Sequence, residues 1–254
     1  FLLLNFVRQH LDAANVEQTT ALEADSRVIS YSLTSTTTEV GDSLPDLLDL
    51  SKLDHINITQ DDTAMSLTMA DYILVEDKLN KLVGNFGLRV SEAEVTDLDT
   101  LANKNEVSSI QISDASADVS ASWDQLLALG DKLNSIEITN DQVPVAITFD
   151  QYAISATTIA KLLPANQALA LLDVPPDQAT DASGEENVAT VSVKGLASQV
   201  ATNFESLIAL GSKIDAIEIS DGNALVLTQQ QFDADTGGAT LDKFTGVFNL
   251  EVLE

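Results

Sequence analysis

The sequence contains no cysteine, which excludes disulfide scaffolds and metal sites built on thiolates. Its two histidines, His10 and His55, lie far apart along the chain. Aromatic residues make up only 5% of the chain, with a single tryptophan, Trp123. Stacking platforms for sugars or nucleic-acid bases are therefore poorly supplied.

Positive charge is also scarce. The chain has 12 Lys and Arg residues against 40 Asp and Glu residues, which gives a formal net charge of −28. Such a surface repels phosphate backbones and anionic lipids, so we expect neither nucleic acid nor a membrane surface as partner. It favours cations and solubility in salt. No apolar run approaches the roughly 18 to 20 residues that span a bilayer, so no membrane insertion is expected.

The motifs of common catalytic sites are missing too. The sequence has no Gly-x-Ser-x-Gly nucleophile motif, no glycine-rich phosphate loop and no His-Glu-x-x-His metal helix. Carboxylates are so abundant that two neighbouring ones do not single out a glycosidase pair. We therefore predict a protein that is not an enzyme, with no catalytic residues and no cofactor other than, at most, calcium.

An internal repeat is the strongest pattern present. The segment 51–59 (SKLDHINIT) returns at 131–139 (DKLNSIEIT) and at 212–220 (SKIDAIEIS), so that Lys52, Lys132 and Lys213 recur 80 and then 81 residues apart. Self-similarity at a fixed spacing is typical of repeat architectures. It divides the chain into an N-terminal strand or linker segment, 1–27, and three repeats, 28–106, 107–187 and 188–254.

Each repeat is predicted to read strand–helix–strand–corner–strand–helix–strand. Apolar residues alternate with polar ones in the first strands, and an apolar stripe of about three helical turns follows. The first strands hold Val28, Tyr31 and Leu33, then Val107, Ile110 and Ile112, then Val188, Val191 and Val193. The second strands are 56–58, 136–138 and 217–219; the third end at Thr68, Thr148 and Thr228; the fourth are 88–90, 169–171 and 248–250. The three threonines are predicted helix N-caps, and 91–106 and 173–187 are predicted exposed loops or hinges.

These predictions define an α/β repeat protein of three units of about 80 residues, stacked as an α/β solenoid with parallel strands and helices along one side. Three globular α/β domains on a string is the competing layout. The lysines at 52, 132 and 213, and a second set at 81, 161 and 243, are expected at helix ends, where a cation meets the negative pole of the helix dipole. Trp123 lies on an apolar helix stripe and is expected in the core.

Polar corners between the second and third strands are the candidate metal sites. Oxygen-rich corners suit calcium, and they also suit turn formation, so both interpretations stay open. The candidate calcium ligands are Asp61, Asp62, Asn140, Asp141, Asp221 and Asn223. No Asp-x-Asp-x-Asp-Gly loop and no Gly-Gly-x-Gly-x-Asp repeat accompanies them.

Both ends of the chain are predicted assembly sites. A repeat array with uncapped apolar ends has open strand edges, and open edges recruit another chain. Two arrangements satisfy this: the chain is a slice of a longer array, or copies associate end to end with strand exchange through the N-terminal segment. The candidate assembly residues are Phe1, Leu2, Leu3, Leu4, Phe6 and Val7, with Phe248, Leu250 and Val252.

The segments 118–129, 132–139 and 145–148 resemble repeats of very long secreted bacterial proteins, adhesin-like and surface-layer-like chains of the type I secreted class. The resemblance covers residues 28–254 and lies in apolar spacings. It implies an extracellular or cell-surface location and a structural or adhesive role as a module of a fibre, surface layer or adhesin stalk, often near calcium-binding modules. The partner would be another copy or a neighbouring repeat. The alternative is a carbohydrate-binding or polysaccharide-acting solenoid with a glycan or cell-surface target.

Overall fold

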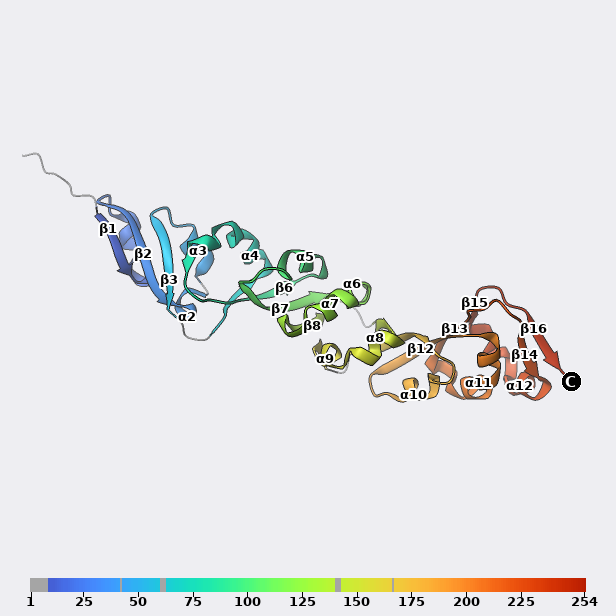
Figure 1. Ribbon diagram of the computed structural model, residues 1–254. Helices are drawn as coiled ribbons and strands as arrows, with labels where there is room; N and C mark the ends of the chain where they lie inside the picture. Colours follow the sequence, from blue (N-terminus) through green and yellow to red (C-terminus); the bar gives the residue numbers. More distant parts are fainter. Residues whose placement is uncertain (1–8, 42, 60–62, 140–142, 166) are drawn as a thin grey trace, which may run out of the picture. The chain divides into compact units, whose positions relative to one another are not determined.

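The computed structural model describes residues 9–41, 43–59, 63–139, 143–165 and 167–254. The chain forms two compact units (Figure 1). Unit 1 comprises Phe1–Ser113 with Leu129–Ile136, and unit 2 comprises Asp114–Ala128 with Glu137–Glu254. Both are mixed α/β, and the strand pairs whose registers are defined are all parallel. The predicted class, α/β with parallel strands, is therefore confirmed.

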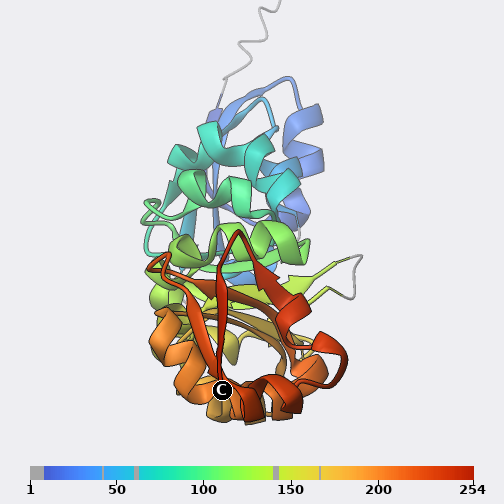
Figure 2. The same ribbon diagram turned by 90° about the vertical axis from the view of Figure 1, so that its right-hand side faces the viewer.

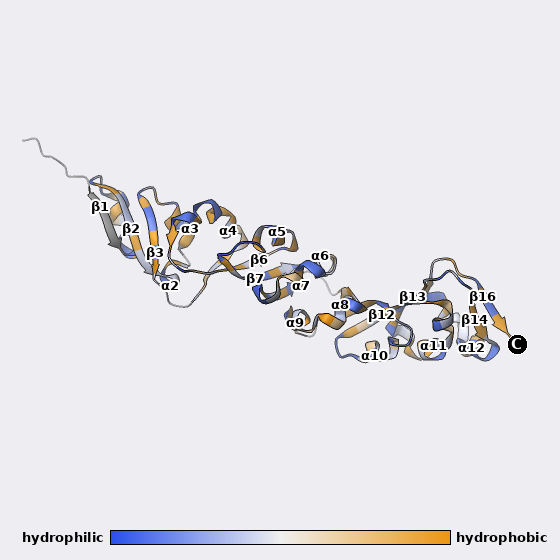
Figure 3. Cartoon of the chain, in the orientation of Figure 1, coloured by the Kyte–Doolittle hydropathy of each residue, from blue (hydrophilic) through white to orange (hydrophobic). Residues whose placement is uncertain are grey.

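Unit 1 contains two parallel arrangements of strands. The first has the order β1 (Gln9–Ala14), β2 (Val28–Thr36), β3 (Leu53–Thr59) and β5 (Leu82–Val83). The second has the order β4 (Met65–Thr68), β6 (Leu88–Ala93), β7 (Val107–Asp114) and β8 (Leu133–Ile138). Buried and exposed residues alternate along β3, and Figure 3 shows the matching alternation of hydropathy. This alternation is the period-2 pattern that the sequence predicts.

Unit 2 contains one larger sheet and one two-stranded sheet. Its larger sheet has the order β9 (Val145–Thr148), β11 (Leu169–Val174), β12 (Val188–Gly195), β13 (Ile214–Ile219) and β15 (Phe244–Thr245). A two-stranded sheet pairs β14 (Leu225–Thr228) with β16 (Leu250–Leu253), and β10 is Leu162–Leu163. Helices α10, α11 and α12 lie along one side of these strands (Figures 1 and 2), and α11 contacts β13 and β14.

The helices are short, apart from one. Those of unit 1 are α1 (Thr19–Ala24), α2 (Thr37–Gly41), α3 (Leu44–Leu48), α4 (Met69–Val75) and α5 (Leu98–Leu101), with 3-10 turns η1 (Val16–Gln18), η2 (Glu76–Lys81), η3 (Val95–Asp97) and η4 (Gly130–Lys132). Those of unit 2 are α6 (Ser116–Ala121), α7 (Trp123–Ala128), α8 (Phe149–Ile154), α9 (Ala156–Ile159), α10 (Ala179–Gly184), α11 (Ala197–Leu210) and α12 (Gln229–Ala234), with η5 (Gly211–Lys213), η6 (Thr236–Gly238) and η7 (Leu241–Lys243).

The predicted helix of three turns forms without a break only as α11. Its counterparts are split into α2 with α3, and α6 with α7. Pro45 stands in the first turn of α3 and has no N–H to continue an earlier helix, so a new helix starts there. In α6 the Ser120 hydroxyl donates to the Ser116 carbonyl at 2.5 Å and accepts from the Ala146 N–H at 2.8 Å. Such bonds compete with the helical pattern.

Three further predictions are wrong in detail. The supposed loops 91–106 and 173–187 contain α5 and α10, because Leu98 and Leu101 are buried apolar residues rather than loop residues. The apolar spacing predicts Leu82, Leu162 and Phe244 in the second helices, but they begin the short strands β5, β10 and β15. The last strand is β16, Leu250–Leu253, not 248–250. Phe248 precedes it and places its ring 4.7 Å from the ring of Phe244.

Three strand pairs share one register. Met65 pairs with Leu88, Val145 with Leu169, and Leu225 with Leu250, and each ladder continues for four residues. β6 and β11 also share a bulge: Glu92 has φ 56° and Asp173 has φ 55°, and the register with the next strand shifts there. β1 shows the same register shift against β2, between Leu11 and Ala14.

The predicted caps and core residue are confirmed. The hydroxyls of Thr68, Thr148 and Thr228 each accept a hydrogen bond from the backbone N–H three residues later, at 3.1 to 3.2 Å. Trp123 is fully buried, and its Nε1–H donates to the Ser155 hydroxyl at 2.9 Å. The indole polar group is thereby satisfied inside the core.

Candidate functional site

The recurring lysines Lys52, Lys132 and Lys213 donate hydrogen bonds to backbone carbonyls about 25 to 30 residues earlier in the sequence. The Lys52 ammonium donates to the carbonyls of Leu22, Glu23 and Asp25, at 3.3, 2.6 and 2.9 Å, at the C-terminal end of α1. Lys132 donates to Ala102 and Lys104 carbonyls, at 2.9 and 2.8 Å, just after α5. These carbonyls lie at the negative end of a helix, which favours a cation.

Three further lysines also donate to backbone carbonyls of earlier segments. Lys213 donates to the Val188 carbonyl at 2.7 Å, and Lys81 donates to the carbonyl of Leu48, the last residue of α3, at 3.3 Å. Lys243 donates to the carbonyls of Gly211 and Ile214. Apart from Lys213, these lysines reach the end of an earlier helix, about 27 to 33 residues back, rather than the helix that directly precedes each of them. Lys213 reaches Val188, the first residue of β12. These cations are structural, and they leave no free positive site at those positions.

The clearest unpartnered surface lies on the last strands of unit 2. β6 pairs with β4 on one side and β7 on the other, and β11 pairs with β9 and β12. Among the described strands β16 pairs only with β14 (Figure 1). The exposure of the side chains agrees with this difference in pairing. Leu88 and Leu169 are 0% and 1% exposed, whereas Leu250, at the same register position, is 38% exposed.

Phe232 on α12 is also more exposed than the aromatic residues at the corresponding positions of α4 and α8. Tyr72 in α4 is completely buried, and burial together with the nearby charge of Glu76 raises its pKa. Tyr152 in α8 is partly buried, and burial, the charge of Glu185 and a hydrogen bond to it raise its pKa. Phe232 in α12 stands four residues after its capping threonine, as both tyrosines do, and it is 39% exposed.

The connections into β7 and β12 each place a charged residue beside one of the two tyrosines. Lys104 lies close enough to Tyr72 to affect its titration, and its ammonium forms an ion pair with Glu76 at 2.6 Å. Glu185 is the residue that follows α10. Phe232 is more exposed than either tyrosine, and Val247 and Leu253, which follow it in the sequence, are exposed as well.

The predicted assembly residues are thus only partly placed. Leu250 and Val252 lie together on β16, and Phe248 packs against Phe244 instead of joining the strand. The remaining predicted assembly residues, Phe1, Leu2, Leu3, Leu4, Phe6 and Val7, lie outside the described residues. The strand position beside β2 is held by β1, which begins at Gln9.

Four of the predicted calcium ligands, Asp61, Asp62, Asn140 and Asp141, also lie outside the described residues. Asp221 and Asn223 form a turn instead. The Asp221 carboxylate accepts hydrogen bonds from the N–H of Ala197, the first residue of α11, at 3.2 Å, and from the Asn223 amide at 2.7 Å. Partial burial raises the pKa of Asp221, but these hydrogen bonds outweigh it and hold the pKa below its usual value.

Within the described part of the chain, no three His, Asp or Glu side chains are arranged to hold a metal ion. Asp221 directs its oxygens at N–H donors, which is the geometry of a helix cap. Calcium binding at the corners stays a prediction, and the only described corner serves turn formation.

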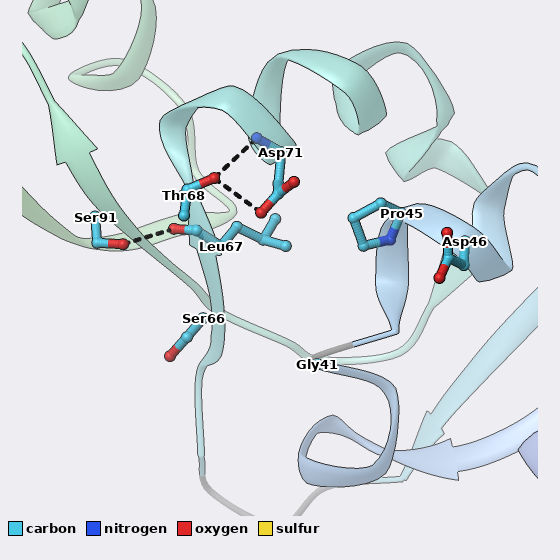
Figure 4. Close-up of a pocket in the computed structure, with 8 residues that line it drawn as sticks. All are labelled: Gly41, Pro45, Asp46, Ser66, Leu67, Thr68, Asp71 and Ser91. Carbon is cyan, nitrogen blue, oxygen red and sulfur yellow. Dashed lines mark hydrogen bonds between the residues drawn. The ribbon is translucent and has the colours of Figure 1, made fainter.

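One pocket, of about 400 Å³, lies in unit 1 (Figure 4). Its polar lining is Asp46, Asp71, Ser66, Thr68 and Ser91. Thr68 donates to the Asp71 carboxylate at 2.8 Å, and Ser91 donates to the Leu67 carbonyl at 3.3 Å. None of the described residues that line this pocket carries an imidazole, an ammonium group or an aromatic ring, so they provide no platform for a sugar ring. No motif or residue spacing in the sequence predicts this pocket.

Comparison with known proteins gives no relative: no family model, no curated protein and no solved structure matches this chain. Among the described residues, no helix is both long enough and apolar enough to cross a membrane.

Proposed function

We propose that this chain is a non-enzymatic structural repeat module that associates end to end, in an extracellular bacterial fibre, surface layer or adhesin stalk. The observation that carries the proposal is the exposure of Leu250 on a strand paired on one side only, where Leu88 and Leu169 are fully covered. An apolar strand edge of this kind is a template for another chain.

The proposal includes a repeat architecture, the α/β solenoid. It is supported by the common register of the β4–β6, β9–β11 and β14–β16 pairs and by the shared bulge at Glu92 and Asp173. In this interpretation each closing strand joins its own repeat to the first strand of the next. The recurring lysines then tie each layer to the one before it: Lys52 and Lys132 bind carbonyls at a helix end, and Lys213 binds the carbonyl at the start of β12.

The extracellular location rests on composition and on the resemblance to secreted bacterial repeats. A cysteine-free chain with 40 acidic residues suits that class. The carbohydrate-binding alternative has one supporting feature, the hydroxyl- and carboxylate-lined pocket at Asp46 and Asp71. The lack of an aromatic ring in that lining makes it the weaker proposal.

Negative-stain electron microscopy of the purified chain tests the function proposed. At increasing protein concentration we expect strings of particles joined end to end. Separate particles at every concentration, together with a positive glycan-array signal that Asp71→Asn abolishes, would support the carbohydrate-binding alternative instead.

A further inference from the structure

Two backbone N–H groups of β4 are directed toward the pocket of unit 1. The Met65 N–H donates to the Gly87 carbonyl at 2.9 Å, so Met65 hydrogen-bonds toward β6. Because successive residues of a strand direct their N–H groups to opposite sides, Ser66 and Thr68 direct theirs away from β6. Both residues line the pocket (Figure 4). Hydrogen-bond donors of a strand edge are therefore part of the pocket wall.

In unit 2, side chains cap the two equivalent positions of β9. The Ala146 N–H donates to the Ser120 hydroxyl at 2.8 Å, and the Thr148 N–H donates to the side-chain carbonyl of Gln151 at 2.9 Å. Helix α6 supplies Ser120 and helix α8 supplies Gln151. The outward N–H groups of β9 are thus satisfied within unit 2.

Unit 1 has neither of these two acceptors. Gly41 of α2 stands where α6 has Ser120, since each follows the buried valine of its helix, and Gly41 brings no hydroxyl. Asp71 stands where α8 has its glutamine, three residues after the capping threonine. The Asp71 carboxylate accepts from the Thr68 hydroxyl at 2.8 Å, and it does not form the capping box that α8 has. No described residue accepts a hydrogen bond from the N–H of Ser66 or Thr68.

The rest of the polar wall is negative. Asp46 and Asp71 line the pocket, and neither belongs to an ion pair among the described residues. A carboxylate or phosphate could accept from the two N–H groups, but these aspartates would repel it. An uncharged carbonyl oxygen accepts from the same N–H groups without this repulsion. The wall therefore suits a ligand that combines carbonyl oxygens with a positive charge.

We infer that the edge of β4 and this pocket bind a short extended peptide with a basic side chain, supplied by another protein. Two peptide carbonyls accept from the Ser66 and Thr68 N–H groups, because the carbonyls on one side of an extended chain recur at the same interval as the donors of β4. The basic side chain binds Asp46 and Asp71. A pocket of about 400 Å³ lies within the usual range for ligand sites. This binding is separate from end-to-end association.

Fluorescence anisotropy with a labelled Val-Lys-Val-Lys-Val peptide, blocked at both ends, measures this binding. We expect saturable binding to the wild-type chain at about 0.15 M salt, where long-range charge attraction is screened. The acidic counterpart, Val-Glu-Val-Glu-Val, should not bind. Spermidine carries positive charge but no carbonyl, and it should compete at least about tenfold more weakly than the unlabelled basic peptide.

Two closing variants, Gly41→Ser and Asp71→Gln, give unit 1 the acceptors of unit 2. At position 41 a Cβ would lie 3.9 Å from the Met65 Cα, which is an ordinary van der Waals contact, so the serine fits. Asp71→Gln supplies the acceptor for the Thr68 N–H and completes a capping box. Each closing variant should weaken peptide binding at least about fivefold without lowering the melting temperature.

Asp99→Gln is the matched control for Asp71→Gln. It removes the same charge from an exposed position that does not line the pocket, and it should change the affinity less than about twofold. Amide hydrogen exchange of the wild-type chain reports the contact directly. Saturating peptide should slow the exchange of the Ser66 and Thr68 N–H groups, which lose their contact with water.

Each outcome decides the inference. The absence of saturable binding, or equal binding by the wild-type chain and both closing variants, would overturn it. Spermidine that competes as well as the peptide would reduce the site to charge attraction and would also overturn it. So would exchange at Ser66 and Thr68 that bound peptide leaves unchanged, or a glycan-array signal that Gly41→Ser abolishes. Sedimentation of the wild-type chain tests end-to-end association separately.

Discussion

At the residue scale, Glu23 joins three parts of unit 1. Its carboxylate accepts hydrogen bonds from the Tyr31 hydroxyl at 3.0 Å, the Ser51 hydroxyl at 2.9 Å and the Lys52 N–H at 2.9 Å. Partial burial raises the pKa of Glu23, but these bonds more than offset it, and the net pKa lies below its usual value. A lowered carboxyl pKa stabilises the fold above the unfolded pKa, and this stability is lost as pH falls through the folded pKa.

Glu23→Gln should therefore lower the urea midpoint of unfolding at pH 6 to 7, and the difference from wild type should shrink as the pH falls below the ordinary glutamate pKa of about 4.3. Circular dichroism during urea titration at several pH values measures this. Glu17→Gln removes the same charge from an exposed position and serves as control. A Glu23→Gln effect that is equal at pH 3 and pH 7 would contradict the proposed role of the charge.

Residue types with a local signature were predictable. The capping threonines follow from their place before a helical stripe, and Trp123 follows from its stripe. The left-handed residues Glu92 and Asp173 were not predictable, because that conformation normally selects glycine. The partners of Glu23 lie 8 to 29 residues away in sequence, so no local spacing reveals them.

At the element scale, Lys52 and Lys132 connect the segment before a strand to the C-terminal end of an earlier helix. Lys132→Met keeps the aliphatic chain but removes two charge-assisted hydrogen bonds, and it should destabilise the fold by about 1 to 2 kcal/mol. Lys78→Met is the matched control, since Lys78 pairs with Asp49 through side chains that are 40% and 70% exposed, and it should change stability by less than about 0.5 kcal/mol. An equal loss of stability in the two variants, measured by chemical denaturation, would contradict a stabilising role for the hydrogen bonds of Lys132.

Most strands were predictable as elements and most helix bounds were not. Period-2 alternation identified the strands that contain Ile56, Ile136 and Ile217, all of which are buried. The two-residue strands β5, β10 and β15 are too short to carry a period. The helices α5 and α10 lie in segments whose turn-forming residues obscured a short apolar face. The last strand, β16, begins two residues later than predicted, because Phe248 is a large apolar residue of the kind that starts such a strand.

At the scale of the whole molecule, net charge and assembly oppose each other. Copies that each carry −28 repel one another over distances of about the Debye length, roughly 8 Å at physiological ionic strength. End-to-end association should therefore strengthen between low salt and about 0.5 M salt, where the contact at β16 is no longer opposed by long-range repulsion. This dependence is opposite in sign to that of a complex held by opposite charges.

Sedimentation velocity over a concentration series at about 0.5 M salt is the most direct measurement of the central claim, that the surface around β16 and Phe232 takes up another copy. We expect a concentration-dependent series of oligomers for the wild-type chain and for Ile154→Asp, an exposed apolar residue of α8, and a monomer for Phe232→Asp. A wild-type chain that stays monomeric throughout, or a Phe232→Asp variant that associates as the wild type does, would contradict the account.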